Sequence, residues 1–156
     1  MNTDLESGMQ LAGQIVDGLQ QSNQCDVVIF PPFPYLQAIE TVIADSSIWL
    51  GGQNVWQQPT GAFTGEVSNS MLLDVGCTFV LAGHSERRHI IGETNELIHQ
   101  KVVSALAAGL QVILCVGETQ DERNAGETMN IVLSQVSSGL NGISTQDMDN
   151  VVIAYE

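Results

Sequence analysis

The first recognisable pattern along the chain is an apolar side chain at every third or fourth position over residues 4–19, which is typical of an amphipathic helix. The positions concerned are Leu5, Met9, Ala12, Ile15, Val16 and Leu19. A continuous apolar run at 26–30 then stops at Pro31 and Pro32, which predicts a short strand buried on both faces. Pro34 suits the first turn of a second helix.

This order of strand and helix repeats to the end of the chain. Four further strands are predicted, at 48–53, 79–82, 111–116 and 151–155. A helical stretch precedes each of them, and the clearest covers residues 94–108, where Gly109 ends the helix. The sequence therefore predicts five strands that alternate with five helices.

Strands that are apolar on both faces and alternate with amphipathic helices indicate an α/β fold with a parallel sheet between helices. Such a sheet is either open and doubly wound or closed into a barrel, and periodicity alone does not choose between the two. No low-complexity tract or linker interrupts the 156 residues. We therefore expect a single domain over 1–156, without an internal boundary.

The charge of the chain narrows the range of partners. The sequence has 18 acidic residues but only four Lys plus Arg, which gives a net charge of −14 at pH 7. So few basic residues form no patch for a nucleic-acid backbone or an anionic lipid surface. No apolar run is long enough to span a bilayer. We therefore expect no nucleic acid and no membrane as a partner.

The cysteines and the start of the chain indicate a reducing compartment. Cys25, Cys77 and Cys115 lie far apart and lack the paired spacing of a zinc site or a redox motif. We expect Cys115 to act as a small buried hydrophobic residue and not as a nucleophile. The first residues show no secretory signal. These features predict free thiols, no metal site and a cytoplasmic protein.

Polar residues stand at the carboxyl ends of the predicted strands, which is where parallel α/β proteins place their active sites. They are Gln53, Asn54, His84, Ser85, Glu86, Gly117, Glu118 and Glu156. A His and a Glu at different strand ends can face one cavity, where the His donates and the carboxylate removes a proton. Taken singly, such a His is more often a hydrogen-bonded loop residue, and such a Glu is usually solvated.

Four motifs favour the catalytic interpretation because they stand in the order of one family. They are GQNV at 52–55 with GAFTGE at 61–66, AGHSERR at 82–88 with IGET at 91–94, CVGET at 115–119, and AYE at 154–156. These motifs cover nearly the whole chain and resemble those of the triosephosphate isomerase family. The resemblance implies a TIM (β/α)8 barrel, of which this chain supplies about strands two to six and the first helix.

The resemblance also implies an isomerase mechanism. Glu156 would move a proton between two carbons of a triose phosphate, and neutral His84 would polarise the carbonyl group and stabilise the enediolate. Dihydroxyacetone phosphate and glyceraldehyde 3-phosphate would interconvert in this way, a step of glycolysis and gluconeogenesis. Ser85, Glu86 and Asn54 would support the two catalytic residues. The resemblance implies neither a metal nor an organic cofactor.

Other charged residues receive structural roles at this stage. Arg87, Arg88 and Glu93 match positions that tie the family's fourth loop to its surroundings. Lys101, the only lysine in the chain, falls within the helix predicted at 94–108. We expect Lys101 on a solvated face of that helix. The family's first-strand lysine falls ahead of Met1 in this match.

Residues 57–66 form a loop that is too long for a simple turn between a strand and a helix. By itself it is typical of a mobile surface loop with Phe63 at the tip. Resemblance to the family's third loop implies that it docks into a second subunit, with Thr64 reaching towards that subunit's active site. We therefore expect a homodimer for the complete protein.

Two alternatives to an isomerase remain open. One is a non-enzymatic fragment or scaffold that keeps the fold pattern and associates through the loop at 57–66. The other is a different phosphate-handling α/β enzyme, which the four ordered motifs disfavour. The family's lid loop and its last two strands would follow Glu156. We therefore expect a polypeptide of residues 1–156 alone to be inactive, with exposed edge strands at 26–30 and 151–155.

Overall fold

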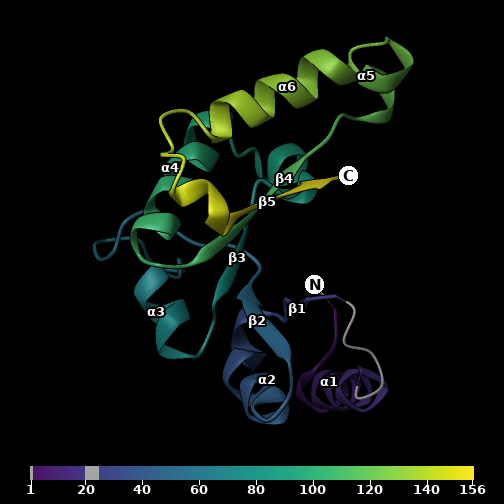
Figure 1. Ribbon diagram of the computed structural model, residues 1–156, viewed down its shortest axis with the longest axis vertical. Helices are drawn as coiled ribbons and strands as arrows, with labels where there is room; N and C mark the ends of the chain where they lie inside the picture. Colours follow the sequence, from purple (N-terminus) through teal and green to yellow (C-terminus); the bar gives the residue numbers. More distant parts are fainter. Residues whose placement is uncertain (1, 20–24) are drawn as a thin grey trace.

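The computed structural model describes residues 2–19 and 25–156, and within them five parallel strands form one curved sheet in the order β1-β2-β3-β4-β5 (Figure 1). The strands are β1 (Val27–Ile29), β2 (Ile48–Gly52), β3 (Phe79–Ala82), β4 (Gln111–Val116) and β5 (Val151–Tyr155). Each strand therefore pairs with its neighbour in sequence. This arrangement is the consecutive strand order of a (β/α) barrel, and it confirms the predicted parallel α/β fold as a partial barrel.

The helices lie between the strands, as the sequence predicts, but they are more numerous. The α-helices of the described residues are α1 (Leu5–Leu19), α2 (Leu36–Ile43), α3 (Asn69–Asp74), α4 (Asn95–Ala107), α5 (Gln120–Asn124) and α6 (Thr128–Gly139). Shorter helical turns occur at Phe33–Tyr35, Arg87–Ile91 and Asp147–Asn150. The predicted count of five helices is wrong because two α-helices, α5 and α6, separate β4 from β5. Figure 1 shows α1 and α2 beside β1 and β2, and α6 beside β4.

Local signals in the sequence explain where several helices begin. The Thr94 hydroxyl accepts a hydrogen bond from Leu97 N, and the Ser68 hydroxyl accepts one from Met71 N, so these residues cap α4 and α3. Thr119 and Glu122 form a reciprocal capping box at the start of α5. These caps supply partners for amide groups that a helix leaves free at its amino end.

The core lies between the helices and the middle of the sheet. Its buried residues include Ile39, Leu72, Val80, Ile98, Val102, Val112 and Leu114. Burying each such aliphatic side chain contributes about 1.5–3 kcal/mol. The core therefore fixes β3 and β4 most firmly, and these are the two strands that lead into the predicted site.

The two edge strands are exposed, as expected for a chain of residues 1–156, although their apolar sequences are typical of strands buried on both faces. Strand β1 is only half-buried. In β5, Val152 and Ile153 are 50% and 42% exposed. Both strands lie at a free edge of the sheet. This position leaves apolar side chains and backbone groups without a neighbouring strand.

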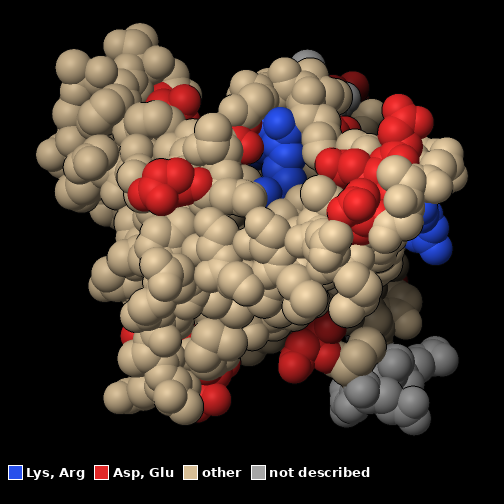
Figure 2. Space-filling model, turned by 90° about the horizontal axis from the view of Figure 1, so that it is seen from above, with Lys and Arg blue, Asp and Glu red and all other residues tan. Residues whose placement is uncertain are grey.

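The surface follows the composition of the chain. In the view of Figure 2, acidic side chains form separate groups and basic side chains are few. No helix in the described part of the chain is both long enough and apolar enough to cross a membrane.

Candidate active site

His84 lies in the turn that follows β3. Gly83 precedes it with a φ of 77°, a left-handed conformation that favours glycine. The carbonyl of His84 accepts hydrogen bonds from Arg87 N at 2.9 Å and Arg88 N at 3.0 Å, so a helical turn begins directly at the histidine. The His84 side chain is 36% exposed. The turn thus presents a partly open imidazole at the carboxyl end of the strand.

One contact indicates which nitrogen of His84 carries the hydrogen. The main-chain N–H of Glu86 donates to His84 Nδ1 over 3.4 Å. An Nδ1 that accepts a hydrogen bond belongs to a neutral imidazole, whose hydrogen is then on Nε2. In a neutral ring, this contact leaves the hydrogen on Nε2, which can donate it to a carbonyl oxygen.

Arg88 fixes this turn to the neighbouring elements. Its guanidinium donates to the carbonyl of Gly83 at 2.6 Å, to the carbonyl of Cys115 at 2.9 Å and to Asn95 Oδ1 at 2.7 Å. These acceptors lie at the end of β3, in β4 and at the start of α4. The predicted anchoring role of Arg88 is in agreement with these contacts, which join His84 to the next strand.

Glu156 follows β5 and is exposed. Its main-chain N–H donates to the carbonyl of Val116 over 2.9 Å, which continues the pairing of β4 with β5 by one residue. Gly117 lies so close that a Cβ atom there would overlap the carbonyl oxygen of Glu156. The end of β4 therefore sets the position of the Glu156 backbone.

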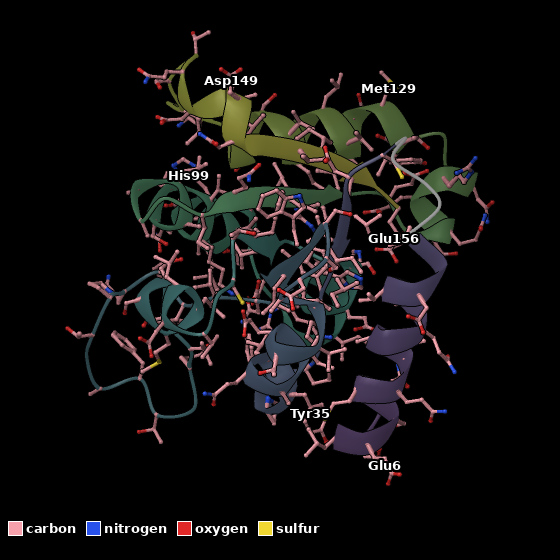
Figure 3. All side chains as sticks on the ribbon, turned by 60° about the horizontal axis from the view of Figure 1, so that its bottom comes forward. Glu6, Tyr35, His99, Met129, Asp149 and Glu156 are labelled. Carbon is pink, nitrogen blue, oxygen red and sulfur yellow. The ribbon has the colours of Figure 1, made fainter. Side chains whose placement is uncertain are left out.

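A cavity of about 230 Å³ connects the two strand ends. Ser85 and Glu156 both line it, together with Arg88, Cys115 and Gly117. His84 is not part of this wall, but it adjoins Ser85 in the same turn. In Figure 3, Glu156 is well separated from His99, the histidine of α4. The structure thus places Glu156 next to the turn that carries His84.

Glu118 and Tyr155 hold the ends of β4 and β5 together. Tyr155 OH donates to both carboxylate oxygens of Glu118, at 2.9 and 3.1 Å. Thr128 and Arg123 donate to the same carboxylate at 3.0 and 3.3 Å. The main-chain amide of Glu118, followed by the hydrogen bonds from Tyr155 and Thr128, lowers the pKa of this carboxyl group. Since Tyr155 directly precedes Glu156, these contacts help to fix the end of the strand that leads to Glu156.

Lys101 is the clearest correction to the sequence analysis. Its side chain is 0% exposed, not solvated, and its ammonium group donates to Glu93 Oε1 and to Asn54 Oδ1. Arg87 Nε donates to the same Glu93 oxygen at 2.6 Å. Burial lowers the pKa of Lys101, while the contact with Glu93 acts in the opposite direction. The cost of burying one ammonium group is offset by a carboxylate and an amide.

The same cluster changes the role expected for Asn54. Asn54 is 5% exposed and binds the ammonium group of Lys101. It therefore joins the segment that follows β2 to α4. A signal for this arrangement was present in the sequence, because Lys101 stands three residues after Ile98 and four before Ala105, on the apolar face of α4.

The remaining predicted residues lie at the surface. Glu86 is 71% exposed, and its Oε2 lies 4.0 Å from His84 Nδ1. Thr64 is exposed. Phe63 is 39% exposed and packs against Trp56 with 5.2 Å between ring centroids. The loop is thus long and exposed, as predicted, but Phe63 folds back onto its base.

The cysteines have the properties that the sequence predicts. All three are free, and Cys115 is 5% exposed. Burial raises the pKa of the Cys115 thiol to about 11. A buried thiol of such high pKa is a poor nucleophile, although it lies in the wall of the cavity.

Sequence reasoning also missed Gln135, a buried polar residue that contacts the end of β4. It is 8% exposed, and its carboxamide bonds to both backbone groups of Gly117. As for Lys101, the sequence signal for burial is the place of the residue on its helix. Gln135 stands three residues after Val132 and four before Gly139, on one face of α6.

These observations define a class of protein. Consecutive parallel strands alternate with helices, and a histidine and a carboxylate follow two of these strands at their carboxyl ends. This is the arrangement of a (β/α) barrel, which places its functional side chains at that end of the strands.

Comparison with known sequences identifies the family within this class. The sequence model of the family described as triosephosphate isomerase matches residues 1–156. The chain therefore belongs to the triosephosphate isomerase family.

Individual relatives agree with the family match. The chain is 47% identical over 157 residues to the triosephosphate isomerase of Prosthecochloris aestuarii, covering 100% of this chain and 62% of the relative. The identity to that of Rhodopirellula baltica is 44% over 156 residues, covering 100% and 61%. For Herminiimonas arsenicoxydans it is 49% over 132 residues, covering 85% and 53%. The chain thus spans between 53% and 62% of the length of these curated relatives.

Proposed function

We propose that the complete protein is a triosephosphate isomerase, which interconverts dihydroxyacetone phosphate and glyceraldehyde 3-phosphate. One observation carries the proposal: Glu156 lines the same cavity as Ser85, the residue that follows His84. Family membership supports the choice of a triose phosphate as the substrate.

In the proposed reaction Glu156 is the base. Its carboxylate takes a proton from the carbon next to the substrate carbonyl group, and the electron pair of that C–H bond moves towards the carbonyl oxygen. The proton of the hydroxyl group on the first carbon passes to the former carbonyl oxygen, and return of the carbon-bound proton to the neighbouring carbon then gives the isomer. No atom is gained or lost, so the step requires no oxidant or reductant.

His84 stabilises the intermediate in this scheme. Glu86 N donates to His84 Nδ1, which supports a neutral ring with its hydrogen on Nε2. The Nε2–H group donates to the substrate oxygen as negative charge develops there in the enediolate. The three hydrogen bonds of Arg88 help to fix the turn, so little reorganisation is needed during the reaction.

We further propose that the complete protein is a homodimer that forms through the loop at 57–66. The exposed part of Phe63 and the exposed side chains of Ile90 and Ile91, 77% and 63% accessible, support an apolar interface. Thr64 would reach towards the active site of the second subunit. We assign the protein to the cytoplasm, in keeping with its three free cysteines.

The test is a coupled isomerase assay on the complete protein. We expect His84→Gln and Glu156→Gln each to lower kcat/KM by about 10²–10⁴-fold, the usual contribution of a positioned acid or base. His99→Gln is the matched control, because His99 lies on α4 and its Nδ1 contacts the carbonyl of Gly139 over 3.2 Å. Near-normal activity in both site variants would refute the assignment.

A further inference from the structure

Gln135 lies where α6 packs closely on the sheet. One turn further along the same helix face, a Cβ atom at Gly139 would come within 2.7 Å of Leu114 Cδ2, so the helix backbone lies almost against β4. Gln135 is 8% exposed in this contact. A carboxamide that is buried against apolar groups is costly unless both of its polar atoms find partners.

Both polar atoms of Gln135 bind one residue. The N–H of Gly117 donates to Gln135 Oε1 at 2.8 Å, and Gln135 Nε2 donates to the carbonyl of Gly117 at 3.0 Å. The carboxamide thus takes the place of a neighbouring strand at the point where β4 ends. Two hydrogen bonds to one residue fix both the position and the orientation of its backbone.

The opposite side of Gly117 carries the backbone of Glu156. Glu156 N donates to the carbonyl of Val116 at 2.9 Å, and the Glu156 carbonyl occupies the space where a Cβ of residue 117 would be. A shift of Gly117 is therefore transmitted directly to Glu156. No side chain lies between them to absorb it.

We propose that Gln135 is a positioning residue for the catalytic base Glu156. The proposal rests on the isomerase function proposed above. Gln135 acts through Gly117, and it sets the distance of the Glu156 carboxylate from the substrate carbon. A displacement of about 1 Å at a reacting group can cost about 10²-fold in rate.

Gln135→Met in the complete protein tests this role, because methionine has a similar length and forms neither hydrogen bond. We expect kcat to fall about 10–10²-fold while KM stays within about twofold, since substrate contacts are unchanged. Val132→Ala is the matched control on the same helix, where Val132 is half-buried. It should lower stability and leave kcat near normal.

A purely structural Gln135 would give a different result. Gln135→Met would then resemble Val132→Ala, with lower stability and a normal kcat, and this outcome would overturn the proposal. If Gln135→Met does not fold, Gln135→Glu keeps the side-chain length and the acceptor for Gly117 N–H. A loss in kcat without a change in KM is expected there too, and a normal kcat would overturn the proposal.

A double variant provides the second readout. Glu156→Asp already withdraws the carboxylate, so adding Gln135→Met should lower kcat by much less than it does alone. If the loss of kcat in the double variant equals the product of the two single losses, the proposed coupling is contradicted. An inactive wild-type protein would refute the isomerase function itself, whereas an active wild type with a normal Gln135→Met kcat refutes only the role of Gln135.

Discussion

Replacing Lys101 by methionine tests whether the buried cluster stabilises the fold. Methionine keeps most of the length of the side chain but removes the ammonium group. Two hydrogen bonds are lost, one to the Glu93 carboxylate and one to Asn54 Oδ1. Glu93 stays buried, with a side chain that is 4% exposed.

The expected cost follows from what remains around Glu93. Removing one partner of a buried ion pair costs about 3–5 kcal/mol, because it leaves an uncompensated charge. Here Arg87 still donates to Glu93, which places the cost near the lower end, at about 3 kcal/mol. The control is Arg123→Met, since Arg123 is 63% exposed and the Glu118 carboxylate keeps its hydrogen bonds from Tyr155 and Thr128 in this variant, so a smaller loss of stability is expected.

The assay is urea unfolding of the complete protein at one fixed protein concentration, because subunit association would alter the apparent stability. We expect the free energy of unfolding to fall by about 3 kcal/mol in Lys101→Met. The double variant Lys101→Met with Glu93→Gln should recover part of this loss, since a neutral amide is less costly to bury. Equal losses in Lys101→Met and Arg123→Met, or no recovery in the double variant, would refute the reasoning.

Three further predictions concern the isolated chain, the acid stability and the association of the protein. A purified polypeptide of residues 1–156 should show no turnover in the coupled assay, because β1 and β5 are the two edges of its sheet and the barrel is not closed; a rate near that of the complete enzyme would contradict this. The pKa of Glu118 is lower in the folded state than its usual 4.5, so its carboxylate stabilises the fold above that pH and loses this effect as the pH falls. The stability of wild type relative to Glu118→Gln, measured by urea unfolding, should therefore decline as the pH falls below about 4.5, and a constant difference would exclude the effect. Phe63→Asp should shift the complete protein towards monomer in sedimentation experiments, whereas Thr60→Ala should not; an unchanged dimer would argue against the loop as its interface.

The periodicity of the sequence determined most of the secondary structure. Phe79–Ala82, Gln111–Val116 and Val151–Tyr155 are strands with the predicted bounds. Five consecutive strands separated by amphipathic helices leave few arrangements other than a parallel sheet. Periodicity could not choose between an open sheet and a barrel, because both bury the same apolar faces.

The candidate active site, too, could be predicted from the sequence only in part. The strand-end positions of His84 and Glu156 are visible in the sequence, since the carboxyl ends of parallel strands meet at one edge of the sheet. Ser85 and Glu156 share one cavity only because the pairing of β3, β4 and β5 brings the two ends together. The pattern of the sequence alone does not show how close these two strand ends lie to each other.

The buried polar residues depended on tertiary structure most of all. Lys101 and Gln135 each stand on the apolar face of a helix, which indicates burial, but the pattern does not identify the groups that bind a buried polar side chain. Glu93 and Asn54 bind Lys101 from 8 and 47 residues away, and Gly117 binds Gln135 from 18 residues away. The sequence by itself determined the elements, their order and the strand ends that bear the chemistry. Only the folded chain decided which polar groups are buried together, since a buried charge or amide is tolerated only where distant segments supply its hydrogen bonds.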